Sequence, residues 1–253
     1  MKIYNKIVNS KVLNKKSFAV LLDPDKLTTS ECIKLVNKSQ EAVIDYFFIG
    51  GSLITRKNFN DIIKVVKDHS DIPVVIFPGS NLQIDENADA ILLLSLISGR
   101  NPEFLIGQHV IAAPLLKESG IEVVPTGYML VDCGKPTTVS YISNTTPIPH
   151  DKPSVASCTA LAGEMLGMRL TYLDGGSGAK EPISPEMIAM TRKTVNTPII
   201  VGGGIDTKEK AAAALKAGAD IIVVGNAIES NPDFLNEVSE TVKFQNLPSD
   251  IHQ

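Results

Sequence analysis

Short apolar runs recur along the whole chain and are separated by amphipathic segments, and this alternation constrains the fold most. Runs rich in Val, Ile and Leu that alternate with helical patterns are typical of βα units around a parallel sheet. The runs cover 18–22, 46–49, 74–77, 90–94, 123–131, 170–173, 199–201 and 221–224. Because the 253 residues fit the size of a barrel built from eight such units, the sequence predicts an α/β fold with a single (β/α)8 TIM barrel.

The segments between the runs predict the helices and one departure from a regular barrel. Helices are expected at 30–42, 58–69, 102–118, 154–167, 185–195, 207–217 and 232–243. Before the helix at 207–217, Asp206 and Glu209 have the spacing of a capping box, and Gly218 is expected to end that helix. Between Pro78 and Ala90 the chain is too short and polar for a full helix. The helix of the third unit is therefore expected to be missing or replaced.

Composition indicates one globular domain over residues 1–253, in the cytoplasm. The uninterrupted apolar stretches are far shorter than the ~18 residues of a transmembrane helix, so no such segment is expected. No apolar run typical of a secretory signal follows the lysines of residues 1–16. A net charge of −4 gives no basic footprint for nucleic acid. The 3 cysteines lack CxxC spacing and are expected to be reduced.

Two glycine-rich turns near the C-terminal end predict a phosphate site. Each turn, Val201–Ile205 and Val224–Ala227, follows a β-branched run and precedes a helical pattern. Glycines leave backbone N–H groups unobstructed, and helix N-termini attract anions. The loops after strands seven and eight are the usual phosphate site of this barrel.

A third loop rich in glycine follows the 170–173 run and predicts a polar clamp for a substrate. It reads Tyr172-Leu173-Asp174-Gly175-Gly176-Ser177-Gly178 and offers a carboxylate, a hydroxyl and an aromatic ring beside exposed backbone. The same composition is also common in plain flexible loops.

The ends of the first two runs carry oxygen ligands that suit magnesium. Asp23 follows the first run, and Ser52 follows Gly50-Gly51 after the second. Mg²⁺ usually takes one or two protein oxygens and leaves its other positions to water and phosphates, so Asp23 and Ser52 could share one ion. The Asp-Pro-Asp turn alone also fits a helix N-cap or a simple turn.

Five motifs together resemble the geranylgeranylglyceryl phosphate synthase family, also called the heptaprenylglyceryl phosphate synthase family. They are LLDPDK, FFIGGS, YLDGGSGA, VGGGI and VVGNAIE, in order between Phe18 and Glu229. The resemblance implies a (β/α)8 barrel with an altered third helix. It also implies an enzyme that needs Mg²⁺ and joins sn-glycerol 1-phosphate to a prenyl diphosphate through an ether bond, releasing diphosphate.

The resemblance also implies roles for individual residues. Asp23 and Ser52 would hold the metal. The glycerol phosphate would be bound by Tyr172, Leu173, Asp174, Gly175, Gly176, Ser177, Gly178, Gly203, Gly204, Gly225 and Asn226. Some members have Lys at the position of Leu21 and Glu at that of Asp174; the residues here resemble the branch that makes the geranylgeranyl ether. Family members form dimers or hexamers, so a homo-oligomer is expected.

Two residues of the clamp are predicted to be catalytic. The ring of Tyr172 could stabilise positive charge on the prenyl carbon. Asp174 could take the proton of the glycerol hydroxyl as a general base, or could only orient the glycerol by hydrogen bonds. Both roles of Asp174 stay open at this point.

The prenyl tail needs an apolar channel, expected near the end of the 90–94 run. The candidates, which could also be ordinary core, are Leu96, Ile97, Phe104, Leu105 and Ile106. Arg100 could reach the diphosphate, although a solvated surface position fits it as well. The 4 histidines lack metal-ligand spacing, and no site is assigned to them.

Two other functions fit parts of the pattern. A phosphosugar isomerase could pair Asp23 with Asp132 as acid and base, and it should work in EDTA. A non-catalytic barrel could sense a phosphorylated ligand, which it would bind without turnover.

Overall fold

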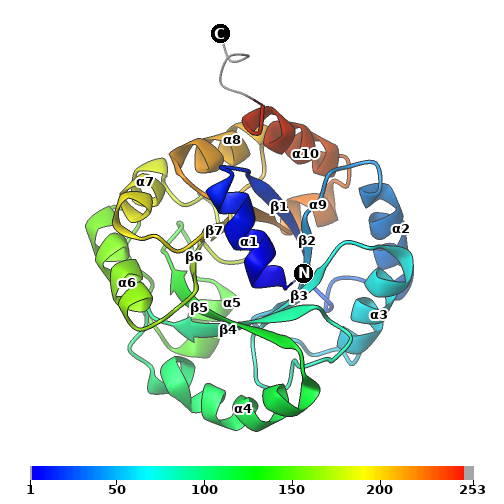
Figure 1. Ribbon diagram of the computed structural model, residues 1–253, viewed down its shortest axis with the longest axis horizontal. Coiled ribbons are helices and arrows are strands. Elements are labelled where there is room, and N and C mark those ends of the chain that lie inside the picture. Colours follow the sequence, from blue (N-terminus) through cyan, green and yellow to red (C-terminus); the bar gives the residue numbers. More distant parts are fainter. Residues whose placement is uncertain (1, 248–253) are drawn as a thin grey trace.

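Eight parallel strands close into a barrel in the computed structural model, which describes residues 2–247. The strands form a central ring with the helices outside it (Figure 1), so the predicted (β/α)8 TIM barrel is confirmed. Their bounds are β1 Ser17–Leu22, β2 Tyr46–Gly51, β3 Val74–Pro78, β4 Ala90–Leu96, β5 Glu122–Leu130, β6 Leu170–Asp174, β7 Ile199–Gly202 and β8 Ile221–Val224.

Side chains of the strands alternate between two apolar cores. Tyr46 and Phe48 of β2 belong to the cluster inside the barrel, whereas Phe47 and Ile49 belong to the cluster between barrel and helices. Both faces of each strand are thus buried, and this explains why the sequence shows continuous apolar runs instead of alternating ones.

The outer helices agree in position with the sequence prediction. They are α2 Thr29–Ser39, α3 Phe59–His69, η1 Glu103–Gly107 followed by α4 Gln108–Ser119, α6 Pro153–Met165, α7 Pro185–Thr194, α8 Lys208–Ala217 and α10 Phe234–Gln245. Two short helices were not predicted, α5 Thr138–Ser143 and α9 Asn226–Ser230.

The connection from β3 to β4 contains no helix, as predicted. Its polar side chains instead bind the backbone of tight turns. Oε1 of Gln83 accepts the N–H of Gly79 at 2.9 Å, and Oδ1 of Asp85 accepts the N–H of Asn87 at 2.8 Å. Such local bonds compete with helix formation.

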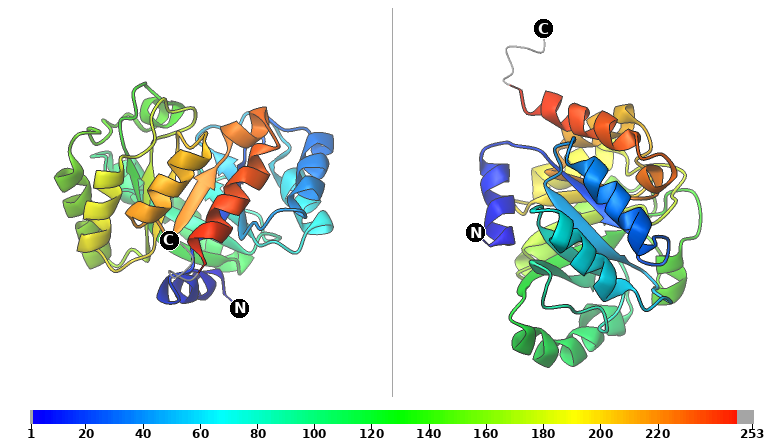
Figure 2. Two further views of the ribbon diagram at one scale, coloured as in Figure 1. Left: turned by 90° about the horizontal axis from the view of Figure 1, so that it is seen from above. Right: turned by 90° about the vertical axis from the view of Figure 1, so that its right-hand side faces the viewer.

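An unpredicted helix, α1 (Ile3–Val12), crosses the N-terminal end of the barrel, where Figures 1 and 2 show it in blue. Ile3 and Ile7, four residues apart on one face, are buried against the barrel interior. The carboxylate of Glu122, at the start of β5, accepts the N–H groups of Ile3 and Tyr4. Because α1 covers this end, the barrel opens at the C-terminal ends of the strands.

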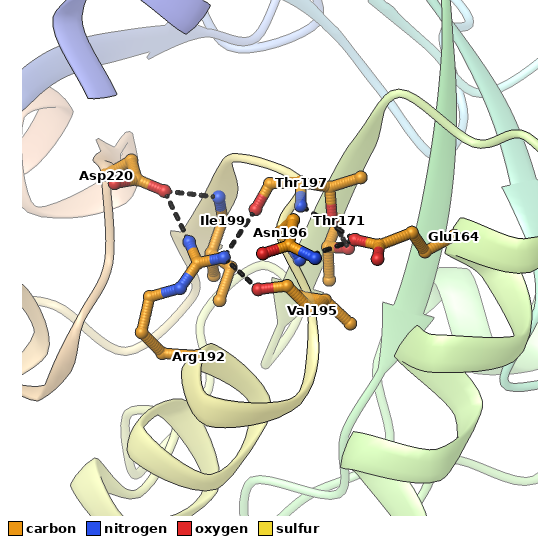
Figure 3. A network of polar contacts seen from close by, with 8 residues as sticks. All are labelled: Glu164, Thr171, Arg192, Val195, Asn196, Thr197, Ile199 and Asp220. Carbon is orange, nitrogen blue, oxygen red and sulfur yellow. Dashed lines mark hydrogen bonds and ion pairs between the residues drawn. The ribbon is translucent and has the colours of Figure 1, made fainter. Parts of the chain in front are cut away.

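A polar network joins the starts of the late strands at the same end (Figure 3). Arg192 donates to Oδ2 of Asp220 at 2.9 Å and to the carbonyl of Thr197 at 2.9 Å. Oδ2 of Asp220 also accepts the N–H of Ile199 at 2.8 Å, and Glu164 accepts the N–H of Thr197 at 2.8 Å. In this fold such contacts at the N-terminal face serve stability.

The start of α8 differs from the prediction. The N-cap is Thr207, whose hydroxyl accepts the N–H of Lys210, and Asp206 forms an ion pair with the Lys210 side chain at 2.6 Å. The capping box of Asp206 and Glu209 is therefore wrong, because Thr207 has the extended backbone of a cap residue. Gly218 ends the helix as predicted, with φ +121°.

Two expectations from composition concern the oxidation state of the cysteines and the presence of transmembrane helices. Cys32, Cys133 and Cys158 are free thiols. Between residues 2 and 247, none of the helices combines the length and the apolar character that spanning a bilayer requires.

Candidate active site

One cavity at the C-terminal mouth of the barrel gathers most of the predicted site residues. Its lining includes Asp23, Ser52, Tyr172, Asp174, Gly176, Ser177, Gly178, Gly203, Gly204, Gly225 and Asn226. The residues come from the ends of β1, β2, β6, β7 and β8, and parallel strands bring their carboxyl ends to the same rim. The predicted metal ligands and the glycine turns thus face a shared space.

Two predicted substrate-binding residues do not face it. The side chain of Leu173 is fully buried in the core between barrel and helices, because strand alternation turns it away from the mouth. The N–H of Gly175 donates to the carbonyl of Gly202 at 3.0 Å, so it is already used within the barrel. Neither residue lines the cavity, and their contact with a substrate stays a prediction.

The glycines of the mouth have backbone that other residues rarely adopt. Gly176, Gly178, Gly203 and Gly204 have φ between +69° and +84°. A Cβ added to Gly203 would lie 2.7 Å from the backbone nitrogen of Gly175. The late loops therefore pack closely against each other and form a cup at this side of the mouth.

The side-chain amide of Asn226 borders the cup and is held in place by two hydrogen bonds. Its Oδ1 accepts from Nζ of Lys26 at 2.7 Å and from Oγ of Ser177 at 3.2 Å. No role was predicted for Lys26, although LLDPDK contains it. Only the closure of β8 against β1 brings it to Asn226.

Asp23 lies at the other side of the mouth. Its side chain is 21% exposed, and Oδ1 accepts the N–H of Asp25 at 3.0 Å. A Cβ added to Gly51 would lie 3.5 Å from Oδ1 of Asp23, so the carboxylate borders the segment that carries Ser52. Asp25 has another role, since its carboxylate accepts N–H groups of the loop before α3, including that of Thr55.

Asp174 is a buried carboxylate with two donors. Oδ2 accepts from the Tyr128 hydroxyl at 2.6 Å, and Oδ1 accepts the N–H of Gly176 at 2.8 Å. Burial raises the pKa of Asp174, and the two hydrogen bonds oppose this rise by stabilising the anion. Burial also raises the pKa of Tyr128 well above its ordinary value, so this phenol stays a donor.

Three aromatic rings meet beside Asp174. The ring centroids of Phe77 and Tyr172 are 5.3 Å apart, those of Tyr128 and Tyr172 5.5 Å, and those of Phe77 and Tyr128 5.9 Å. Tyr172 was predicted, whereas Phe77 and Tyr128 were missed because β3 and β5 contribute them from distant parts of the sequence.

A second, mainly apolar cavity adjoins the mouth. The two cavities share Gly51, Ser52 and Phe77. The apolar cavity is lined from β4 by Ile91, Leu93, Leu94 and Leu96 and from η1 and α4 by Phe104, Ala112 and Leu116. Of the predicted channel residues, Leu96 and Phe104 line it.

The other predicted channel residues lie elsewhere. Ile97 and Leu105 line a separate groove beside α6, and Ile106 is 60% exposed. These three residues do not line the apolar cavity: Ile97 follows the end of β4, and Leu105 and Ile106 lie on η1.

Arg100 and Asp132 do not reach the mouth. Arg100 is exposed, donates to the carbonyl of Gly99 at 3.0 Å and borders the groove beside α6. Asp132 is exposed and is not part of the cavity lining that contains Asp23. The acid/base pair that an isomerase would need is therefore not assembled. Within residues 2–247, no group of three or more His, Cys, Asp or Glu side chains could hold a metal.

Fold and site together define a (β/α)8 barrel of the phosphate-binding class. It is distinguished by an apolar channel that opens into the mouth beside a buried carboxylate and three aromatic rings.

The chain belongs to the PcrB family, whose model matches residues 10–242. It is 59% identical over 92% of its length to a protein of Spirosoma linguale named geranylgeranylglyceryl phosphate synthase, of which 94% is covered. It is 43% identical over 88% of its length to a protein of the same name from Thermococcus gammatolerans, of which 88% is covered. The family predicted from the motifs is confirmed.

Solved structures agree with these sequence matches. The (S)-3-O-geranylgeranylglyceryl phosphate synthase of Thermoplasma acidophilum, solved with its substrate sn-glycerol-1-phosphate, aligns with a TM-score of 0.91 and 33% identity. The alignment covers 96% of this chain and 99% of that one. An N-acetylmannosamine-6-phosphate 2-epimerase from Clostridium perfringens, with a TM-score of 0.57 and 12% identity over 90% of this chain and 94% of that one, shares the fold alone.

Proposed function

We propose that the protein transfers a geranylgeranyl group from its diphosphate to sn-glycerol 1-phosphate, acting as a geranylgeranylglyceryl phosphate synthase. The observation that carries this proposal is the junction of two unlike cavities at Gly51, Ser52 and Phe77. A polar mouth with an anion cup suits glycerol phosphate, and an apolar channel suits a prenyl tail. The names of the relatives support the same reaction.

The cup is the proposed site of the glycerol phosphate. Backbone N–H groups of the loops after β6, β7 and β8 would bind the phosphate, together with the amide of Asn226. The glycerol hydroxyls would then lie toward Asp174, the buried carboxylate on the same rim.

The aromatic rings are the proposed environment of the reacting carbon. A glycerol oxygen forms the ether bond to the first prenyl carbon, and the bond from that carbon to the diphosphate oxygen breaks with its electron pair. Positive charge that develops on the carbon would face the rings of Phe77, Tyr128 and Tyr172. A ring face beside a cation contributes about 0.5–2 kcal/mol.

Asp174 is the proposed acceptor of the hydroxyl proton. Its two hydrogen bonds leave lone pairs free, because a carboxylate has about four acceptor positions. Its raised pKa, caused by burial, makes it a stronger base than an exposed aspartate. Orientation of the glycerol without proton transfer is the competing role, and the two differ in their pH dependence.

The residues at the first two strands fit magnesium. Asp23 offers a partly exposed carboxylate beside the segment of Ser52, and a carboxylate and a hydroxyl are hard oxygen donors. When bound there, Mg²⁺ would neutralise the diphosphate and make it a better leaving group. Among residues 2–247 no group of three or more His, Cys, Asp or Glu side chains could hold a metal, so an ion at Asp23 would take most of its ligands from water and a substrate.

A labelled-substrate assay tests the proposal. Purified protein is incubated with Mg²⁺, each labelled enantiomer of glycerol phosphate and prenyl diphosphates of several lengths, and organic-extractable label is measured. We expect label to be extracted with sn-glycerol 1-phosphate and the geranylgeranyl diphosphate, and extraction to stop in EDTA. Binding without turnover would instead indicate a sensor, and phosphosugar isomerisation in EDTA would indicate an isomerase.

The homo-oligomeric state and the cytoplasmic location remain predictions. Light scattering of the purified protein distinguishes a dimer or hexamer from a monomer of 27.2 kDa.

A further inference from the structure

The ammonium group of Lys26 lies between the two halves of the mouth. It is 3.4 Å from Oδ2 of Asp23, the proposed metal ligand, and 3.2 Å from Oε2 of Glu229 on α9. On its other side it donates to Oδ1 of Asn226 at 2.7 Å. One cation therefore contacts both the carboxylate at the first strand and the amide of the phosphate cup.

The contact with Lys26 also decides how the Asn226 amide is oriented. Because Lys26 donates and the Ser177 hydroxyl donates to the same atom, that atom is the amide oxygen. Nδ2 then points toward the cup, where a Cβ added to Gly178 would lie 3.4 Å from it. The donor that faces a bound phosphate is thus held in place from the side of β1.

We propose that Lys26 is a positioning residue that couples the binding of glycerol phosphate to the occupation of Asp23. The inference rests on the proposed function. Without a cation at Asp23, the charge of Lys26 is shared between two carboxylates and the amide. When Asp23 binds a divalent cation with diphosphate, Lys26 keeps Glu229 and Asn226 as partners. The ammonium group then attracts a phosphate in the cup more strongly.

This role should affect ligand binding more than folding. The side chain of Lys26 is 40% exposed, and ion pairs with exposed partners contribute little to the free energy of unfolding. A phosphate and a diphosphate held side by side repel each other, and a fixed ammonium between them offsets that repulsion. Since binding coupling is reciprocal, Lys26 should also strengthen diphosphate binding when glycerol phosphate is present.

Calorimetric titration of sn-glycerol 1-phosphate tests the coupling, with and without Mg²⁺ and inorganic diphosphate. We expect the wild type to bind glycerol phosphate more tightly when Mg²⁺ and diphosphate are present. Lys26→Met should weaken binding about tenfold and remove this enhancement, because a hydrogen bond to a charged group is lost. Lys26→Arg should restore part of it. Lys34→Met removes the same charge from an exposed position on α2 and should behave as the wild type.

The outcomes separate this inference from the proposed function. If the wild type neither binds sn-glycerol 1-phosphate nor forms extractable product, the proposed function fails. If the wild type does both but shows no enhancement, or if Lys26→Met keeps the wild-type enhancement, Lys26 does not couple the two sites. A loss shared equally by Lys34→Met would show a general charge effect and would also overturn the inference.

Discussion

Substitution of Tyr128 by Phe isolates the hydrogen bond that the proposed base accepts. The Tyr128 hydroxyl donates to Oδ2 of Asp174 at 2.6 Å, and both side chains are buried. Phe keeps the ring, so the contacts with Phe77 and Tyr172 remain. The substitution therefore removes one donor from a buried carboxylate and little else.

The expected effect is a shift of the pH–rate profile. The hydrogen bond from Tyr128 lowers the pKa of Asp174 against the effect of burial, so its loss should raise that pKa further. A base acts only when it is deprotonated. As the pH is lowered, the activity of the variant should therefore begin to fall at a higher pH than the activity of the wild type. A hydrogen bond to a charged group contributes about 1.5–3 kcal/mol, which corresponds to a roughly ten- to hundredfold loss of kcat/KM on the acidic limb. Above that limb the loss should be smaller.

The measurement is kcat/KM for sn-glycerol 1-phosphate across pH, with saturating prenyl diphosphate. Tyr46→Phe is the matched control, because Tyr46 is buried within the same barrel and its hydroxyl has no hydrogen-bond partner in residues 2–247. Its profile should coincide with that of the wild type. If Tyr128→Phe raises KM equally at every pH and the acidic limb does not move, Asp174 orients the glycerol and is not the base.

Three further predictions concern the metal, the cup and the N-terminal end of the barrel. Asp23→Asn should abolish turnover while the calorimetric affinity for sn-glycerol 1-phosphate without Mg²⁺ stays nearly intact; equal loss of both would contradict the proposed division of the mouth. Gly203→Ala should prevent detectable glycerol phosphate binding, because its backbone has φ +84° and a Cβ would lie 2.7 Å from the nitrogen of Gly175; wild-type affinity would refute the cup. Arg192→Met should reduce the free energy of unfolding in urea by about 1–3 kcal/mol, because Asp220 loses its charged donor; unchanged stability would show that the network in Figure 3 contributes little.

The regular part of the fold could be predicted from the sequence because each strand carries its own signal. β-branched runs buried on both faces are recognisable without knowledge of their neighbours. α1 could not be predicted in this way, because it has only Ile3 and Ile7 to bury, and the carboxylate that accepts its first N–H groups belongs to Glu122. Glu122 can be recognised as the partner of α1 only in the folded barrel, where β5 lies beside this helix.

The same distinction applies to the site. Glycines and acidic residues at strand ends could be predicted because their positions on the rim follow from the repeat. Tyr128 and Lys26 could not, because their roles arise from partners on other elements, Asp174 of β6 and Asn226 of α9. The burial of the Leu173 side chain away from the cavity could not be predicted for a related reason, since a loop motif does not show which of its residues still follows strand alternation.

The missing helix after β3 would let this barrel accept the apolar substrate of the proposed reaction beside a phosphate. In a regular barrel a helix would pack over β3 and β4, but here the polar turns of 79–89 occupy that connection. Leu93 of β4 and Ala112 of α4 consequently line an open cavity that reaches Phe77 at the mouth. Each CH₂ group of a prenyl tail that leaves water for this cavity contributes about 0.8 kcal/mol. Under the proposed function, the cup would need only glycines that many phosphate-binding barrels possess, whereas specificity for a prenyl donor would require the cavity that the shortened connection leaves open.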